Sequence, residues 1–223
     1  MDDEVGAPKS PMVRDHAQTA LEVAALASSL VPVLGGVFGG LLSGFATDRK
    51  LKRLADLIEK LAAEIDSRAV VVDESYIRTE DFEDLFERTL QQATQERSEE
   101  KRRRYAAFLA TDMANPGTVY ERKLDFLRTL EVIQPIHLLV LRAIAAPPMA
   151  DAGSFGTQLN TLRGRLPGST EQQIVEAVGK LNDLRVTSLN SLRAMVTARG
   201  AADLRGGLTA YGEEFMEYVD GPQ

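Results

Sequence analysis

The sequence has no cysteine and only two histidines, His16 and His137, in 223 residues. Without cysteine the chain has no disulfide bond, no thiolate zinc site and no cysteine nucleophile, which fits a reducing compartment. The two histidines lie far apart in the sequence, so they do not indicate a metal site. Since no nucleophile or phosphate-loop motif is present either, we expect a non-enzymatic protein with no catalytic residues, no cofactor and no metal.

The sequence is also poor in aromatic residues and in net positive charge. It has no tryptophan, 6% aromatic residues, a net charge of -7 and a pI near 5.0. Because single-stranded bases stack on aromatic side chains and phosphates bind basic surfaces, binding to nucleic acid is not expected. The hydrophobic content of 44% is ordinary for a folded protein, and the length predicts one or two domains.

One long stretch, residues 23–47, contains no charged residue and is rich in glycine. As a single helix it would reach about 37 Å, enough for a hydrocarbon core of about 30 Å, but Pro32 is expected to kink or split it. Small residues four apart let two helix backbones approach closely, which predicts helix packing or oligomerisation. Segment 20–47 is therefore either a membrane or oligomer segment, or a glycine-packed helix pair in a soluble bundle. The glycines are Gly35, Gly36, Gly39, Gly40 and Gly44.

Residues 1–19 contain acids, two prolines and few apolar residues, which predicts a flexible tail. This tail lacks the basic start of a secretory signal, so cleavage of the apolar stretch as a leader is not expected.

Basic residues follow the uncharged stretch directly. If that stretch spans a membrane, the positive-inside rule places the rest of the chain in the cytoplasm. The basic residues are then candidate contacts for anionic lipid, and they are Arg49, Lys50, Lys52 and Arg53.

The next apolar residues are spaced by three and four, which predicts a coiled-coil seam that packs against a partner helix of the same bundle or of another subunit. The seam consists of Leu51, Leu54, Ile58, Leu61 and Ile65.

Residues 48–133 predict a helical bundle. Ser98 is the expected N-cap of one of its helices. The basic run 101–104 follows three glutamates, so we expect a solvated face with local ion pairs. The acidic residues between 80 and 87 have no histidine near them and are also expected to be a solvated face. His137 lies among apolar residues and is expected in the core or at its boundary.

Residues 134–223 have the order of a winged-helix module: three helices, a segment at 186–207 that forms a small β wing, and a last helix. Ser169 and Gln172 predict a capping box at the start of the third helix. That helix carries Glu171, Glu176 and Asp183 against one lysine. A helix that enters the major groove should not be net acidic, so contact with protein or a structural role is favoured. The wing arginines keep contact with DNA open, and these are Arg185, Arg193, Arg199 and Arg205.

Three segments together resemble the Abi-alpha group of bacterial abortive-infection proteins: EDLFERTLQQATQERSEEKRRRYAAFLATDMANP, KLDFLRTLEVIQPIHLLVLRAI and LTAYGEEFMEYV. The resemblance implies a role in phage defence and supplies no catalytic residues. Its matching positions are Phe108, Leu109 and Ala110 in an LLA-type helix, Leu127, Leu130 and Leu138 at leucine positions, and Thr209, Gly212 and Phe215 in the terminal helix.

The sequence thus predicts a mainly all-α protein with a tail at 1–19, a glycine-rich apolar segment at 20–47, a helical bundle at 48–133 and a winged-helix-like module at 134–223. The expected function is that of an oligomerising, membrane-associating effector or adaptor in anti-phage defence, cytoplasmic and associated with the inner membrane. Its expected partners are further copies of itself, membrane lipid and another defence protein. The alternative is a soluble winged-helix regulator or protein-interaction adaptor whose apolar stretch is buried core.

Overall fold

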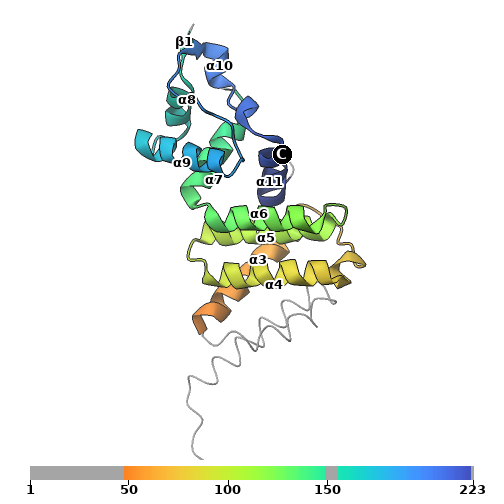
Figure 1. Ribbon diagram of the computed structural model, residues 1–223. Helices are drawn as coiled ribbons and strands as arrows, with labels where there is room; N and C mark the ends of the chain where they lie inside the picture. The colour runs from red at the N-terminus through yellow and green to blue at the C-terminus, as the bar shows by residue number, and fades with distance from the viewer. Residues whose placement is uncertain (1–47, 149–154, 222–223) are drawn as a thin grey trace, which may run out of the picture. The chain divides into compact units, whose positions relative to one another are not determined.

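The computed structural model describes residues 48–148 and 155–221 (Figure 1). Helices make up 71% of these residues, and two short strands form one small sheet. The expected all-α class is confirmed. The predicted tail at 1–19 and the glycine-rich segment at 20–47, with all five of its packing glycines, lie outside the described residues.

The described elements follow one another in a simple order, with two short 3-10 turns, η1 and η2, among them. They are α3 (Asp48–Ser67), η1 (Tyr76–Arg78), α4 (Glu80–Gln95), α5 (Glu99–Ala114), α6 (Tyr120–Val132), α7 (Pro135–Ala145), β1 (Phe155–Gly156), α8 (Gln158–Arg165), α9 (Glu171–Asp183), β2 (Val196–Thr197), α10 (Ala198–Ala202), η2 (Arg205–Gly207) and α11 (Ala210–Asp220).

The chain divides into two compact units, Met1–Leu124 and Asp125–Gln223. The division falls within α6, earlier than the boundary after residue 133 that the sequence predicts. The reason lies in the second half of α6, where the ring of Phe126 packs against Tyr211, Phe215 and Tyr218 of α11. These aromatic contacts make the end of α6 part of the second unit.

Hydroxyl side chains fix several helix starts. The Ser98 Oγ accepts a hydrogen bond from the Lys101 amide at 3.3 Å, which confirms the predicted N-cap. The predicted capping box at Ser169 is wrong by one residue, because Thr170 is the N-cap of α9 and Gln173 completes the box. Both pairs have the same spacing in the sequence, so the pattern alone does not choose between them.

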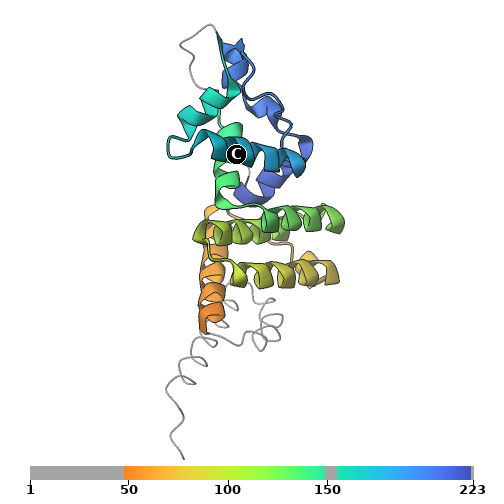
Figure 2. The same cartoon turned by 60° about the vertical axis from the view of Figure 1, so that its left-hand side comes forward.

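In the first unit α3 crosses the pair α4 and α5 at a steep angle (Figure 2). Leu51, Leu54, Ile58 and Leu61 of the predicted seam are at most 1% exposed, while Ile65 is half-buried. The seam packs across two helices of its own chain, whereas a coiled coil aligns two helices at a small angle. It therefore forms part of a globular core, which also contains Leu57.

In the second unit α7 packs against α8 and α9, and β1 pairs with β2 in antiparallel register. The segment 186–207, expected to be a β wing, contains the short helix α10 and the turn η2 besides β2. No helix within residues 48–148 and 155–221 combines the length and apolar character that a membrane span requires.

Candidate functional site

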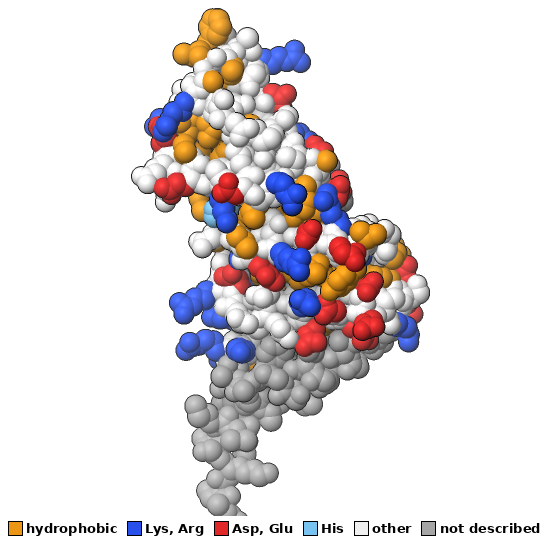
Figure 3. Space-filling model, viewed as in Figure 1, with side chains coloured by type: hydrophobic (Ala, Val, Ile, Leu, Met, Phe, Trp, Pro, Cys, Tyr) orange, Lys and Arg blue, Asp and Glu red, His pale blue; other side chains and the backbone are white. Residues whose placement is uncertain are grey.

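The basic start of α3 is the predicted lipid contact that the structure describes. Arg49, Lys50 and Lys52 are exposed, and Lys and Arg side chains gather over this end of α3 in Figure 3. Arg53 behaves differently, because its guanidinium donates to the backbone carbonyls of Thr94 at 3.1 Å and Gln95 at 3.0 Å. These carbonyls end α4, so Arg53 fixes the start of α3 to the bundle and three of the four predicted cations remain on the surface.

The basic run 101–104 forms the predicted ion pairs, but it is not the solvated face that we expected. The side chains of Lys101 and Arg104 are buried, at 6% and 4% exposure. Their partners are Glu96 and Glu100. The expectation fails because α5 is the central helix of the first unit and is buried on more than one side. Its alanines at 106, 107 and 110 let neighbouring elements approach closely.

Arg102 and Arg103 of the same run join α5 to α3. Arg102 Nε lies 2.5 Å from Asp56 Oδ2, and Arg103 Nε lies 3.1 Å from Glu64 Oε1. Burial of Asp56 opposes its ionisation, but hydrogen bonds from Lys60 and Arg102 outweigh that effect and lower its pKa. The basic run is therefore engaged within the fold and is not available as a phosphate or headgroup site.

A buried polar cluster links η1, α5 and α6. The Lys123 Nζ lies 2.7 Å from Asp112 Oδ1 and donates to the Tyr76 hydroxyl at 2.8 Å. The Tyr76 hydroxyl also donates to Asp112 Oδ1 at 3.0 Å. Burial raises the pKa of Asp112, against the opposing effect of Lys123 and Tyr76.

The charged side chains of this cluster are not accessible to a substrate. Asp112 is 0% exposed and Lys123 is 1% exposed, and the second carboxylate oxygen, Oδ2, is buried without a hydrogen-bond partner. General acid or base catalysis requires a substrate atom within hydrogen-bond reach of the side chain. The cluster is therefore structural. It could not be predicted from the sequence, because its three members belong to three different elements.

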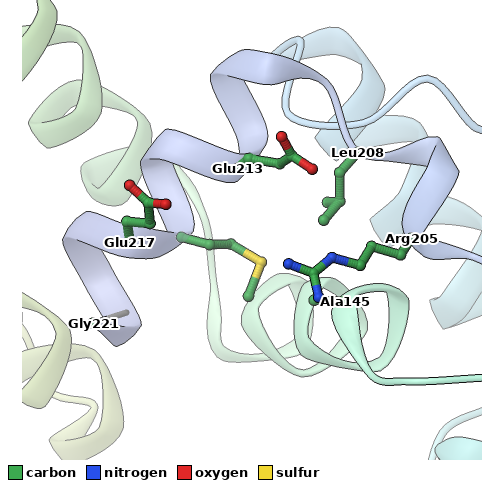
Figure 4. Close-up of a pocket in the computed structure, with 7 residues that line it drawn as sticks. Ala145, Arg205, Leu208, Glu213, Glu217 and Gly221 are labelled. Atoms are coloured by element: carbon green, nitrogen blue, oxygen red, sulfur yellow. The ribbon is translucent and has the colours of Figure 1, made fainter. Parts of the chain in front are cut away.

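A small pocket in the second unit lies between the end of α7, η2 and α11. Glu213 and Glu217 on α11 and Arg205 on η2 surround it (Figure 4). Its volume is about 170 Å³, below the ~300 Å³ at which pockets for drug-sized ligands begin. All three charged residues are exposed, so they remain hydrated and give little preference for one ligand.

The predicted recognition helix is α9. Its exposed residues are polar or acidic and include Gln172, Glu176 and Asp183. Glu171 at its start accepts ion pairs from Arg193 at 2.9 Å and Arg163 at 3.7 Å. Of the wing arginines, Arg193 is thus paired with an acid of the helix itself. This surface presents little positive charge to a phosphate backbone.

Among residues 48–148 and 155–221, no group of three histidine, aspartate or glutamate side chains has the arrangement to hold a metal ion. His137 lies at the core boundary, and its Nδ1 accepts a hydrogen bond from the Gln134 amide at 2.7 Å at the start of α7. Comparisons with protein-family models, with curated proteins and with solved structures found no match to this chain.

Proposed function

We propose that the protein is a non-enzymatic helical adaptor or effector that associates with an anionic membrane surface and with further copies of itself. The observation that carries the proposal is the exposed trio Arg49, Lys50 and Lys52, on a helix start that Arg53 fixes to the bundle, directly after the uncharged stretch 23–47. Each basic residue near an anionic leaflet contributes about 1 kcal/mol to binding.

The resemblance to the Abi-alpha group supports placing this activity in bacterial anti-phage defence, at the inner membrane and with a further defence protein as partner. The terminal Thr209, Gly212 and Phe215 of that resemblance lie at the N-cap of α11 and within this helix. Thr209 caps the helix, Gly212 lies against the Val186 carbonyl and Phe215 is 0% exposed. They are structural positions, in keeping with a non-enzymatic role.

Vesicle binding and fractionation test the membrane role. The full chain should sediment with vesicles containing phosphatidylglycerol, and changing Arg49, Lys50 and Lys52 to glutamine should weaken binding by up to about 100-fold, from three charges at about 1 kcal/mol each. A matched control changes the exposed Arg78, Arg97 and Arg128 to glutamine. Recovery of the full chain in the supernatant without detergent, with equal vesicle binding by both variants, would refute the proposal.

The second candidate is a soluble winged-helix-like adaptor that contacts protein. It is supported by the order α7, β1, α8, α9, β2 with antiparallel pairing of β1 and β2. The acidic and amide surface of α9 favours protein over DNA as the partner. DNA binding would be lost steeply with added salt, and the absence of any shift of duplex DNA at low salt would remove that variant of the second candidate.

A further inference from the structure

Two large apolar side chains are exposed at the small sheet of the second unit. Phe155 in β1 is 70% exposed and Met195, next to β2, is 72% exposed. Phe155 pairs with Thr197 in the antiparallel register, and Met195 precedes Thr197 by two residues. Because side chains alternate between the two faces of a sheet, Phe155, Thr197 and Met195 project from the same face.

The opposite face of this sheet is covered. Gly156 and Val196 face α10, and a Cβ atom placed on Gly156 would lie 3.2 Å from the Cβ of Ala201. One face of the sheet is therefore packed inside the unit, while the other presents Phe155 and Met195 to solvent. Hydrophobic side chains gather around β1 in Figure 3.

Two arginines lie close to this apolar face in the sequence. Arg199 on α10 and Arg193 are both exposed, although Arg193 also pairs with Glu171. The segment 190–202, which carries both arginines and Met195, contains no acidic residue, and the exposed Asp203 follows it. An apolar tip beside cations has the chemistry that binds the interfacial layer of an anionic membrane.

We propose that the Phe155 and Met195 face inserts into the headgroup region of an anionic bilayer, with Arg199 beside the lipid phosphates. This inference rests on the proposed membrane role and gives the second unit a lipid contact of its own. A protein partner fits less well, because a stable interface buries about 800 Å² per partner. Two side chains offer about 400 Å² of contact area at most. Lipid molecules can rearrange around such a small surface.

The absence of tryptophan allows a direct test. The variant Phe155→Trp places a single tryptophan at the tip of the full chain, and Val71→Trp places one at an 84% exposed position of the first unit. With vesicles of phosphatidylcholine and phosphatidylglycerol we expect the emission of Phe155→Trp to shift to shorter wavelength and to be quenched by brominated acyl chains. The Val71→Trp emission should stay unchanged, and adding Arg199→Glu should reduce the shift at position 155.

Each other outcome overturns the inference. If the chain sediments with vesicles but position 155 shows no shift, the tip does not insert and the proposed membrane role still stands. If the chain does not bind vesicles, both proposals fail. A shift at position 155 that appears without vesicles, as the protein concentration rises, would assign the face to contact between copies of the chain.

Discussion

At the residue scale, single arginines hold helix ends together. The Arg165 guanidinium on α8 donates to the carbonyls of Ala143, Ala146 and Pro147 at the end of α7, and to the carbonyl of Ala202 at the end of α10. The last carbonyls of a helix have no partner within the helix, so a forked cation is well suited to them. Arg53 has the same role at the end of α4.

We therefore expect Arg165→Lys to lower the free energy of unfolding by ~2 kcal/mol, because an ammonium cannot reach all four carbonyls and hydrogen bonds to charged groups are worth ~1.5–3 kcal/mol. Urea unfolding measures the loss. Arg163→Lys is the matched control on the same helix, since its ion pair with Glu171 is exposed and long at 3.7 Å and should contribute at most ~0.5 kcal/mol. Equal effects of the two variants would contradict the role of Arg165.

Gly212 illustrates a close approach that only the folded chain reveals. A Cβ atom at this position would lie 2.0 Å from the backbone oxygen of Val186, which is shorter than any real contact. We expect Gly212→Ala to destabilise the protein by ~2–3 kcal/mol through forced backbone movement. Gly179→Ala in α9 is the matched control, because nothing lies within 4 Å of the added atom and alanine favours helix by about 1 kcal/mol. Thermal unfolding should move in opposite directions for the two variants, and a stabilised Gly212→Ala would refute the close contact.

At the scale of elements, polar side chains decide how the helices of the first unit meet. The apolar face of α3 supplies the burial, but the pairs Asp56 with Arg102 and Glu64 with Arg103 connect α3 to α5. The cluster of Tyr76, Asp112 and Lys123 in turn connects η1 and α5 to the start of α6. Each of these side chains belongs to one element and finds its partner on another.

The buried pair gives a prediction about these connections. Removing one member, as in Asp112→Leu or Lys123→Met, leaves a buried group without its counter-charge and should cost ~3–5 kcal/mol. The double variant Asp112→Leu with Lys123→Met should cost far less than the sum, because an apolar pair of similar volume needs no counter-charge. Urea unfolding of the four proteins provides the cycle, and additive effects would show that the two charges do not interact.

The pair of Asp56 and Arg102 predicts a dependence on pH. A carboxylate whose pKa is lowered in the folded state stabilises the protein at every pH above the ordinary pKa of the group, which is 3.8 for aspartate. This stabilisation is lost as the pH falls through the lowered pKa. Asp56→Asn should therefore be less stable than the original protein at pH 7, and the difference should shrink in acid. Glu59→Gln, an exposed change on the same helix, is the control. A difference that stays constant from neutral to acidic pH would contradict the assignment.

At the scale of the whole molecule, the boundary between the two units falls within α6, and the apolar stretch 23–47 lies N-terminal to α3 in the sequence. The proposed oligomerisation depends on the glycine series in that stretch. Changing Gly36, Gly40 and Gly44 to leucine should abolish self-association, because side chains would keep the helix backbones apart. Alanine at the same positions should retain most of it. Light scattering of the full chain measures the mass of the oligomer, and an unchanged mass for the leucine variant would contradict this mechanism.

The sequence by itself determined the helical class, the start of α5 at the Ser98 cap and the apolar face of α3, since these follow from local periodicity and caps. It also located the exposed cations Arg49, Lys50 and Lys52. Only the tertiary structure decided that Arg53 and Arg165 bind helix ends, that Lys101 and Arg104 are buried, and that Asp112 pairs with Lys123. The physical reason is that the sequence does not distinguish a charged side chain that is hydrated from one that binds a distant carbonyl or carboxylate. Only folding brings such a partner within hydrogen-bond distance.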